Sequence, residues 1–269
     1  LSEPSKIRGL DVVLLAVTPF QYNPVTKELV VYSDIQVDVF YEGGNGHFGD
    51  DRLRNDRWDK ILRNTVINSS VLEVVDQKKD SKATGYEYII ICPNDAVYLN
   101  YANQLKTFRV KQGISTTIVT MTEIGGNTEA AIEAYINNAY NNWDIPPSAV
   151  LLMADWGASG SAGTIFAPEF PDTYYPMVSD NFYADVDTSD GKALPEIVFA
   201  RMTAQNETHL QAMVSKIINY ETNPPTTENF YEYPITALGW QTERWFQICS
   251  EAIGGFMKNR SEERRVGKE

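Results

Sequence analysis

Residues 86–92, Tyr-Glu-Tyr-Ile-Ile-Ile-Cys, and residues 149–155, Ala-Val-Leu-Leu-Met-Ala-Asp, decide the fold of this chain. Both are short and strongly apolar, and residues 114–121 and 195–201 form two more runs of the same kind. A strand that is apolar on both sides has both of its faces covered, which is typical of a parallel sheet. The four runs therefore predict the strands of one buried sheet.

Amphipathic helices are predicted between these strands, because apolar residues recur there at helical spacing. The three stripes are Tyr98, Ala102, Leu105 and Phe108; then Ile132, Tyr135, Ile136, Ala139 and Tyr140; then Leu210, Met213, Val214, Ile217 and Ile218. Gly113 is expected to end the first helix, and Asn127 or Thr128 to cap the second. The alternation predicts an α/β fold with helices on both faces of a mostly parallel sheet, and residues 234–240 predict one more strand.

The residues before this part have a different texture. Apolar runs on either side of Asn23-Pro24 predict two strands joined by a turn, and the alternation from Ile35 to Tyr41 predicts a third, half-buried strand. Residues 76–85 show no apolar periodicity, so we expect an exposed linker that proteases can cut. A β-rich segment thus precedes the α/β part.

Composition and charge exclude several classes of protein. The chain has 269 residues, with 23 Lys and Arg against 36 Asp and Glu, so its formal net charge is -13. Binding to a nucleic-acid backbone needs clustered basic residues, and we expect no nucleic-acid partner. No apolar run approaches the ~18 residues of a membrane span. The two cysteines, Cys92 and Cys249, lie in apolar surroundings and are interpreted as buried thiols rather than as a disulfide scaffold or a zinc site.

An acidic loop before the fourth apolar run is the main candidate for a binding site. Five carboxylates fall within 17 residues: Asp180, Asp185, Asp187, Asp190 and Glu196, while Asp155 ends the 149–155 run. So many like charges repel one another without a cation, and carboxylate and carbonyl oxygens are the ligands that Ca²⁺ takes. The spacing is not that of an EF-hand. A solvated acidic loop without an ion is the alternative.

The order of these motifs resembles one known family. The 86–92 strand, a helix that ends in Lys-Thr-Phe-Arg-Val-Lys-Gln-Gly (106–113), the 150–157 run, the acidic loop with its Pro-Glu strand, and a helix ending in Tyr-Glu are similar to the gingipain-type cysteine peptidases, family C25 of clan CD. The resemblance implies a caspase-like fold, with residues 1–80 as a β-rich propeptide-like segment and residues 84–259 as the N-terminal subdomain of the peptidase. Residues 260–269 are predicted to be a non-native tail, to which we assign no function.

The same resemblance implies which residues bind a metal and where the catalytic residues lie. The family's structural calcium site corresponds to Asp155, Asp187, Asp190, the carbonyl of Leu194 and Glu196. No residue here matches the catalytic Cys or His, because His47 and His209 lack the family's sequence context. We therefore expect a fragment that is itself inactive, cut from the zymogen of a bacterial endopeptidase that is secreted or at the cell surface and acts on protein or peptide substrates.

Two alternatives remain open at this point. One is a binding or structural module with the caspase-like subdomain and no peptidase activity. The other is a sortase-like, surface-processing member of the same family. The oligomeric state cannot be read from the residues.

Overall fold

The computed structural model describes residues 1–40, 42–43, 46–72, 83–158, 160–170, 177–186, 195–227, 230–231, 235–239 and 243–266. The chain divides into two compact units, residues 1–215 and residues 216–269, and each is described by itself. We call residues 1–72 the N-terminal segment and residues 83–215 the sheet subdomain. Both belong to the first unit.

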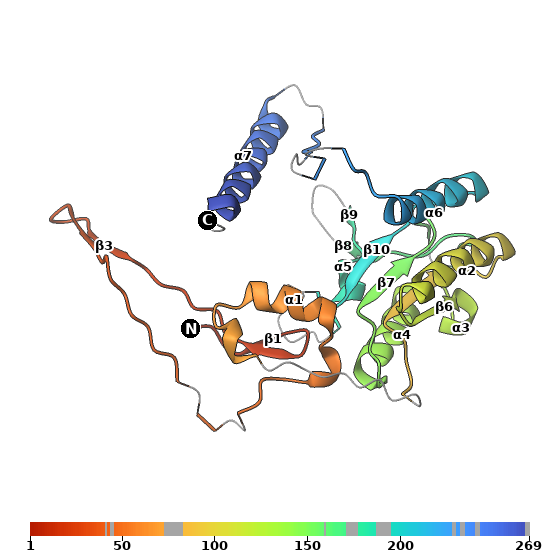
Figure 1. Ribbon diagram of the computed structural model, residues 1–269, viewed down its shortest axis with the longest axis horizontal. Helices are drawn as coiled ribbons and strands as arrows, with labels where there is room; N and C mark the ends of the chain where they lie inside the picture. Colours follow the sequence, from red (N-terminus) through yellow and green to blue (C-terminus); the bar gives the residue numbers. More distant parts are fainter. Residues whose placement is uncertain are drawn as a thin grey trace. The chain divides into compact units, whose positions relative to one another are not determined.

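A four-stranded parallel sheet forms the centre of the sheet subdomain (Figure 1). Its strands are β5 (Tyr88–Cys92), β6 (Thr116–Thr120), β7 (Ala149–Leu152) and β10 (Val198–Arg201), in the order β10-β7-β5-β6. The side chains of Ile89, Ile90 and Ile91 in the central strand β5 are fully buried. All four apolar runs of the sequence are therefore strands of one sheet, as predicted.

Helices cover both faces of this sheet. Helix α2 (Ala96–Lys111) links β5 to β6, and α3 (Met121–Ile124) and α4 (Glu129–Asn142) link β6 to β7. The two crossovers run in opposite directions along the strand order, and because such crossovers are right-handed, α2 and α4 lie on opposite faces. Asp95 caps α2, and Thr128 rather than Asn127 caps α4. The predicted α/β fold class is confirmed.

The connection from β7 to β10 is long and forms much of one end of the sheet. It contains β8 (Glu169–Phe170) and β9 (Met177–Val178), which pair antiparallel, and the short helix α5 (Asn181–Ala184). After β10, helix α6 (Glu207–Thr222) begins in the first unit and ends in the second. Leu210 and Val214, from the stripe predicted for this helix, are buried.

The N-terminal segment has a small core of its own. The hairpin of β1 (Ser5–Ile7) and β2 (Leu10–Val12) packs with helix α1 (Asp56–Thr65) around buried Leu10, Leu62 and Leu72. Two 3-10 turns, η1 (Asp51–Leu53) and η2 (Ser69–Val71), flank α1. The N-terminal segment is β-rich, as predicted, and helix α1 completes the core beside its first hairpin.

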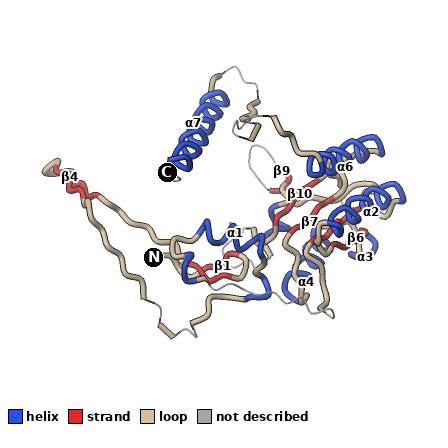
Figure 2. Tube along the Cα trace, viewed as in Figure 1, coloured by secondary structure: helices blue, strands red, loops and turns tan. Residues whose placement is uncertain are grey.

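A second hairpin, of β3 (Phe20–Asn23) and β4 (Glu28–Val31), turns at the predicted Asn23-Pro24 position. The half-buried strand predicted from Ile35 to Tyr41 is wrong for residues 35–40, which are loop (Figure 2). Among the described residues no strand pairs with this run, and without a partner for its backbone groups a strand does not form. Tyr41 lies outside the described residues.

The second unit contains helix α7 (Trp245–Val266) and loop residues before it. Residues 235–239, from the predicted 234–240 strand, are loop, and Ile235 is exposed. Here again an apolar run has no strand beside it. Residues 260–266 continue α7, and whether they are native stays a prediction. Among the helices that the structure describes, none is both long enough and apolar enough to cross a bilayer.

Gly85, near the start of the sheet subdomain, packs against Ile145, which follows α4. This contact can be tested by substitution. The φ of Gly85 is +113°, and a Cβ there would lie 2.4 Å from the backbone oxygen of Ile145, the residue with which Gly85 forms a β-bridge. We expect Gly85→Ala to lower the free energy of unfolding by about 2–4 kcal/mol, through left-handed backbone strain plus this clash.

Gly113→Ala is the matched control, because φ is +79° there and no atom lies within 4 Å of the added Cβ. It carries only the backbone strain, about 1–2 kcal/mol. Urea unfolding of both variants gives the two losses. Equal losses would contradict the close packing of Gly85 against Ile145.

Candidate functional site

The carboxyl ends of the strands hold a set of polar side chains at the place where parallel sheets carry their sites. Asp155 lies three residues beyond β7, and its backbone N–H donates to the carbonyl of Ala204 beyond β10 (3.2 Å). Its carboxylate accepts the N–H of Trp156 (2.9 Å) and the side-chain amide of Gln205 (2.6 Å). Asp155 therefore ties the ends of two adjacent strands together.

Arg201, the last residue of β10, stabilises the same edge. Its guanidinium binds both carboxylate oxygens of Asp180, at 2.7 and 2.8 Å, in a bidentate pair. It also donates to the carbonyls of Ala154, Ile165 and Phe166. Such forked, charge-assisted bonds are the strong ones, so this arginine fixes the β7–β10 connection against the sheet.

Asn127 holds the same connection from the side of α4. Its amide nitrogen donates to the carbonyls of Ser161 (3.1 Å) and Thr164 (3.0 Å), and its amide oxygen accepts the N–H of Phe166 (2.7 Å). The sequence suggested Asn127 as a possible helix cap, but Thr128 takes that position. The asparagine is instead fully used in shaping the loop after β7.

The opposite, amino-terminal edge of the sheet contacts the N-terminal segment. Arg8, at the tip of the β1–β2 hairpin, donates to the carbonyls of Pro147 (2.7 Å) and Glu196 (3.0 Å), which precede β7 and β10. The Arg8 guanidinium also lies 5.0 Å from the ring centroid of Tyr140 in α4. Arg8 is buried, and this burial lowers the pKa of its guanidinium to about 10, so it remains charged at neutral pH.

Two more side chains of the N-terminal segment donate to the same edge. Arg52 donates to the carbonyls of Tyr140 (2.7 Å) and Trp143 (2.9 Å), at the C-terminal end of α4. Helix ends leave such carbonyls without intrahelical partners, and a cation there also suits the helix dipole. The indole N–H of Trp58 donates to the carbonyl of Ser148 at 3.4 Å.

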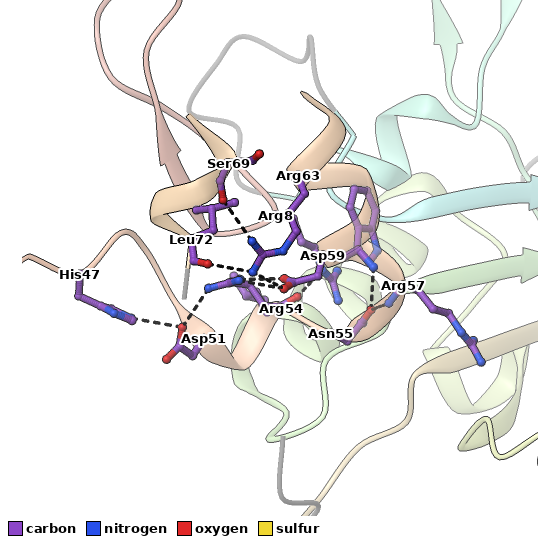
Figure 3. Close-up of polar contacts among 12 residues, drawn as sticks. Arg8, His47, Asp51, Arg54, Asn55, Arg57, Asp59, Arg63, Ser69 and Leu72 are labelled. Atoms are coloured by element: carbon purple, nitrogen blue, oxygen red, sulfur yellow. Dashed lines mark hydrogen bonds and ion pairs between the residues drawn. The ribbon is translucent and has the colours of Figure 1, made fainter. Parts of the chain in front are cut away.

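Charged pairs within the N-terminal segment hold these donors in place (Figure 3). Arg54 binds Asp59 through two hydrogen bonds of 2.9 and 3.0 Å, and Arg54 itself is buried. Arg63 donates to the carbonyls of Ser69 and Leu72, which closes the end of the segment onto α1. These bonds hold Arg54 and the residues from Ser69 to Leu72 against α1.

The two parts in contact match two models of one family. Peptidase family C25 matches residues 81–252, and the propeptide of the same family, Propeptide_C25, matches residues 1–71. The chain belongs to peptidase family C25. The segment whose arginines donate hydrogen bonds to the sheet subdomain is therefore the family's propeptide region. The parallel sheet belongs to its peptidase region, as the sequence motifs predicted.

Relatives in Porphyromonas gingivalis agree with this assignment. The chain is 22% identical to a Lys-gingipain over 87% of its own length and 13% of that protein, and 22% identical to gingipain R2 over 86% and 30% respectively. It thus spans less than a third of the relatives it matches. Among solved structures, the complex of the RgpB pro- and mature domains matches at 20% identity over 50% of this chain and 29% of that one, with a TM-score of 0.40. Dimeric latent PorU matches at 16% over 59% and 18%, with a TM-score of 0.43.

Two of the calcium ligands implied for a C25 peptidase, Asp155 and Glu196, lie at opposite ends of the paired strands β7 and β10. Val198 of β10 pairs with Ala149 of β7, and Arg201 pairs with Leu152. Glu196 therefore precedes the paired strands and Asp155 follows them, so at least the strand length, about 10 Å, separates the two residues. The sheet therefore separates two residues of the implied calcium set, and calcium binding itself stays a prediction.

Glu196 closes the base of the acidic loop rather than reaching Asp155. Its N–H donates to the carbonyl of Ala184 (3.0 Å), and its carboxylate accepts the N–H of Val186 (3.1 Å). The remaining residues of the implied calcium set, Asp187, Asp190 and Leu194, lie outside the described residues. In the part of the chain that is described, no three acidic, His or Cys side chains form a group that could hold a metal.

The cysteines and histidines of this C25 chain lie in separate environments. Cys92 is buried at the end of β5, and this burial raises the pKa of its thiol to about 12, with Glu123 adding to the effect. A thiol is a poor nucleophile when it is protonated at neutral pH. Cys249, on α7, is exposed, so the prediction that both thiols are buried is correct only for Cys92. His47 lies 3.3 Å from Asp51 in the N-terminal segment.

The residues that connect the two C25 regions were not predicted from the sequence. Arg8 precedes the β pattern, which was traced only from Leu10, and Arg52 and Trp58 lie in a polar run (residues 51–63) whose other basic residues resemble Arg52. One local signal was available for Arg8. Residues 5–12, Ser-Lys-Ile-Arg-Gly-Leu-Asp-Val, place Arg-Gly between two short alternating runs, which is the spacing of a two-residue hairpin turn.

Thiol labelling tests the described cysteine environments. In the native chain we expect a thiol alkylating reagent to label Cys249 and to leave Cys92 unmodified, because only the first is exposed. Mass spectrometry of the labelled peptides reads out both sites. Cys249→Ser should abolish native labelling, and denaturant should restore labelling at Cys92; rapid native labelling of Cys92 would contradict its burial in β5.

Proposed function

We propose that this chain is the front part of the precursor of a cysteine endopeptidase, in which the N-terminal segment keeps the peptidase region latent. The observation that carries the proposal is the tandem match of propeptide and peptidase regions, together with the docking of the first on the second through Arg8 and Arg52. The relatives, which are gingipains of a bacterium, support a secreted or cell-surface enzyme with protein or peptide substrates.

The catalytic Cys and His are proposed to lie in a part of the protein beyond this chain. The burial of Cys92 and the raised pKa of its thiol argue against this residue as the nucleophile. The chain covers only 13% of the Lys-gingipain and 30% of gingipain R2, which leaves most of such a protein to supply the pair. The sheet subdomain then acts as a scaffold that carries a catalytic part built elsewhere.

Calcium remains part of the proposal, with a smaller ligand set than the resemblance implied. Asp187, Asp190, the carbonyl of Leu194 and Glu196 fall within ten residues of one loop, so they do not require the ion to span the sheet. Carboxylates and a carbonyl are suitable ligands for Ca²⁺. Asp155, at the other edge, is used by Gln205 and Trp156 and has no part in this set.

This smaller set predicts different behaviour for two acidic residues. Saturating calcium should raise the Tm of the wild-type chain relative to chelator, since a ligand that binds only the folded state stabilises it. Glu196→Gln should remove that difference, and Asp155→Asn should keep it. A calcium effect that is lost in Asp155→Asn and kept in Glu196→Gln would contradict the assignment.

Peptide hydrolysis by the chain and by the full-length precursor tests the enzymatic proposal. The 269-residue chain should not hydrolyse Arg- or Lys-containing peptides in a thiol-dependent manner. The full-length precursor should gain such activity once it is cut between the two family matches, in residues 72–80. A full-length protein without thiol-dependent hydrolysis after this cut would overturn the enzymatic function.

A further inference from the structure

Arg8 lies in a backbone conformation that an arginine rarely adopts. It is the first of two residues that connect β1 to β2, with φ of +49°, and Gly9 follows with φ of +74°. Positive φ at both positions is the pattern of a type I′ turn, for which Asn and Gly are the favoured residues. A side chain with a Cβ is strained in this left-handed conformation, so the turn would be more stable with a glycine in place of the arginine.

The hairpin tip is locked in place behind this arginine. The N–H of Asp50 donates to the carbonyl of Gly9 (2.9 Å). A Cβ at Gly9 would lie 2.5 Å from Cδ1 of Leu53, and a Cβ at Gly49 would lie 1.7 Å from the carbonyl oxygen of Gly9. Residues 49–53 therefore pack closely against the turn and hold the backbone of Arg8 in place.

The Arg8 guanidinium joins the N-terminal segment to two strands at once. Its Nη1 donates to the carbonyls of both Pro147 and Glu196, while its Nε donates to the carbonyl of Leu53 within the segment. Pro147 and Glu196 each lie two residues before a strand, and those strands are in register at Ala149 and Val198. One nitrogen therefore holds the entries of β7 and β10 together.

Two aromatic rings, one from each partner, complete the site. The guanidinium carbon lies 5.5 Å from the ring centroid of Trp58 in the segment and 5.0 Å from that of Tyr140 in α4. Both distances fit cation–π contacts, which are stronger when the cation is removed from water. Arg8 is 0% exposed, whereas the side chain of Arg52, which donates to the end of α4, is 28% exposed. Buried central contacts generally carry most of the binding energy of an interface.

We propose that Arg8 is the anchor of this contact, so that the affinity of the N-terminal segment for the sheet subdomain, in a chain cut between residues 72 and 83, depends on its guanidinium. The proposal rests on the proposed function only in taking such a cut as the natural processing step. Loss of Arg8 leaves the carbonyls of Pro147 and Glu196 without this donor, and removal of a buried charged partner is strongly destabilising.

A cleaved form of the chain tests the anchor directly. A recognition sequence for a site-specific protease replaces residues 76–82, the chain is cut, and the affinity of the two pieces is measured by size-exclusion chromatography and by dilution. We expect the wild-type pieces to elute together and Arg8→Asn to raise their Kd at least tenfold. Asn suits the left-handed turn, so this variant removes the guanidinium without straining the hairpin.

Two further variants separate the anchor from general effects of charge and folding. Arg57→Asn removes an exposed arginine from the same segment and should leave the Kd unchanged. Arg8→Lys keeps the charge and loses the forked donors, so we expect an affinity between those of wild type and Arg8→Asn. Circular dichroism of the uncut variants checks that each one folds. If the Arg8→Asn chain fails to fold, the Arg8→Lys pieces decide.

Unchanged affinity of the Arg8→Asn pieces, or of the Arg8→Lys pieces where that variant decides, would overturn the anchor. The measurement needs no peptidase activity, so it stands apart from the hydrolysis assay. An inactive full-length protein would remove the enzymatic function and leave the anchor in place. An active protease whose cut pieces separate in the wild type would remove the anchor alone.

Discussion

A buried guanidinium that faces backbone carbonyls on two sides is the interaction on which the first unit depends. Arg8 contributes one bond to its own segment, at Leu53, and two to the sheet subdomain, at Pro147 and Glu196. Burying a charge is unfavourable unless the charged group is hydrogen-bonded. Here Nε and Nη1 donate to three carbonyls and two aromatic rings face the guanidinium, while Nη2 has no hydrogen-bond partner among the described residues. The same contact fixes where the N-terminal segment lies and how the entries of β7 and β10 are held.

The two edges of the sheet consequently have different tasks. At the carboxyl edge, side chains bind the loops that follow the strands. Asn127 and Arg201 hold the β7–β10 connection at Phe166 and Ile165, and Asp155 accepts a hydrogen bond from Gln205 beyond β10. At the amino edge, the acceptors are backbone carbonyls of the sheet subdomain and the donors come from the N-terminal segment. In the described part of the chain, the contacts of Arg8, Arg52 and Trp58 with the subdomain all lie at residues 140–148 and 196, away from the carboxyl edge.

The sheet could be predicted from the sequence because its information is local. A run such as Ile89-Ile90-Ile91 is favoured in a strand that is covered on both faces. Amphipathic helices between such runs are compatible with few folds other than a parallel α/β sheet. The strand predictions are wrong at residues 35–40 and 235–239, which are loop, because a strand also needs a neighbour and no local pattern reveals one. The calcium set was implied by motif order, which carries no information on which edge of the sheet Asp155 and Glu196 reach. The turn at Arg8 had a local signal, but its contacts with the sheet subdomain could not be foreseen, since those partners lie 139 and 188 residues away.

The choice of carbonyl acceptors has a consequence for how the two regions can change over evolutionary time. Every residue carries a backbone carbonyl, so substitutions at 147, 148 or 196 that keep the backbone path preserve the acceptors for Arg8 and Trp58. The peptidase region can therefore diverge at this edge without losing its propeptide region. The propeptide region is more constrained in sequence, because its donors are particular side chains and no other residue replaces Arg8 fully. Exchange of propeptide regions between distant members of such a family then depends on the donor side chains of one partner and the backbone shape of the other.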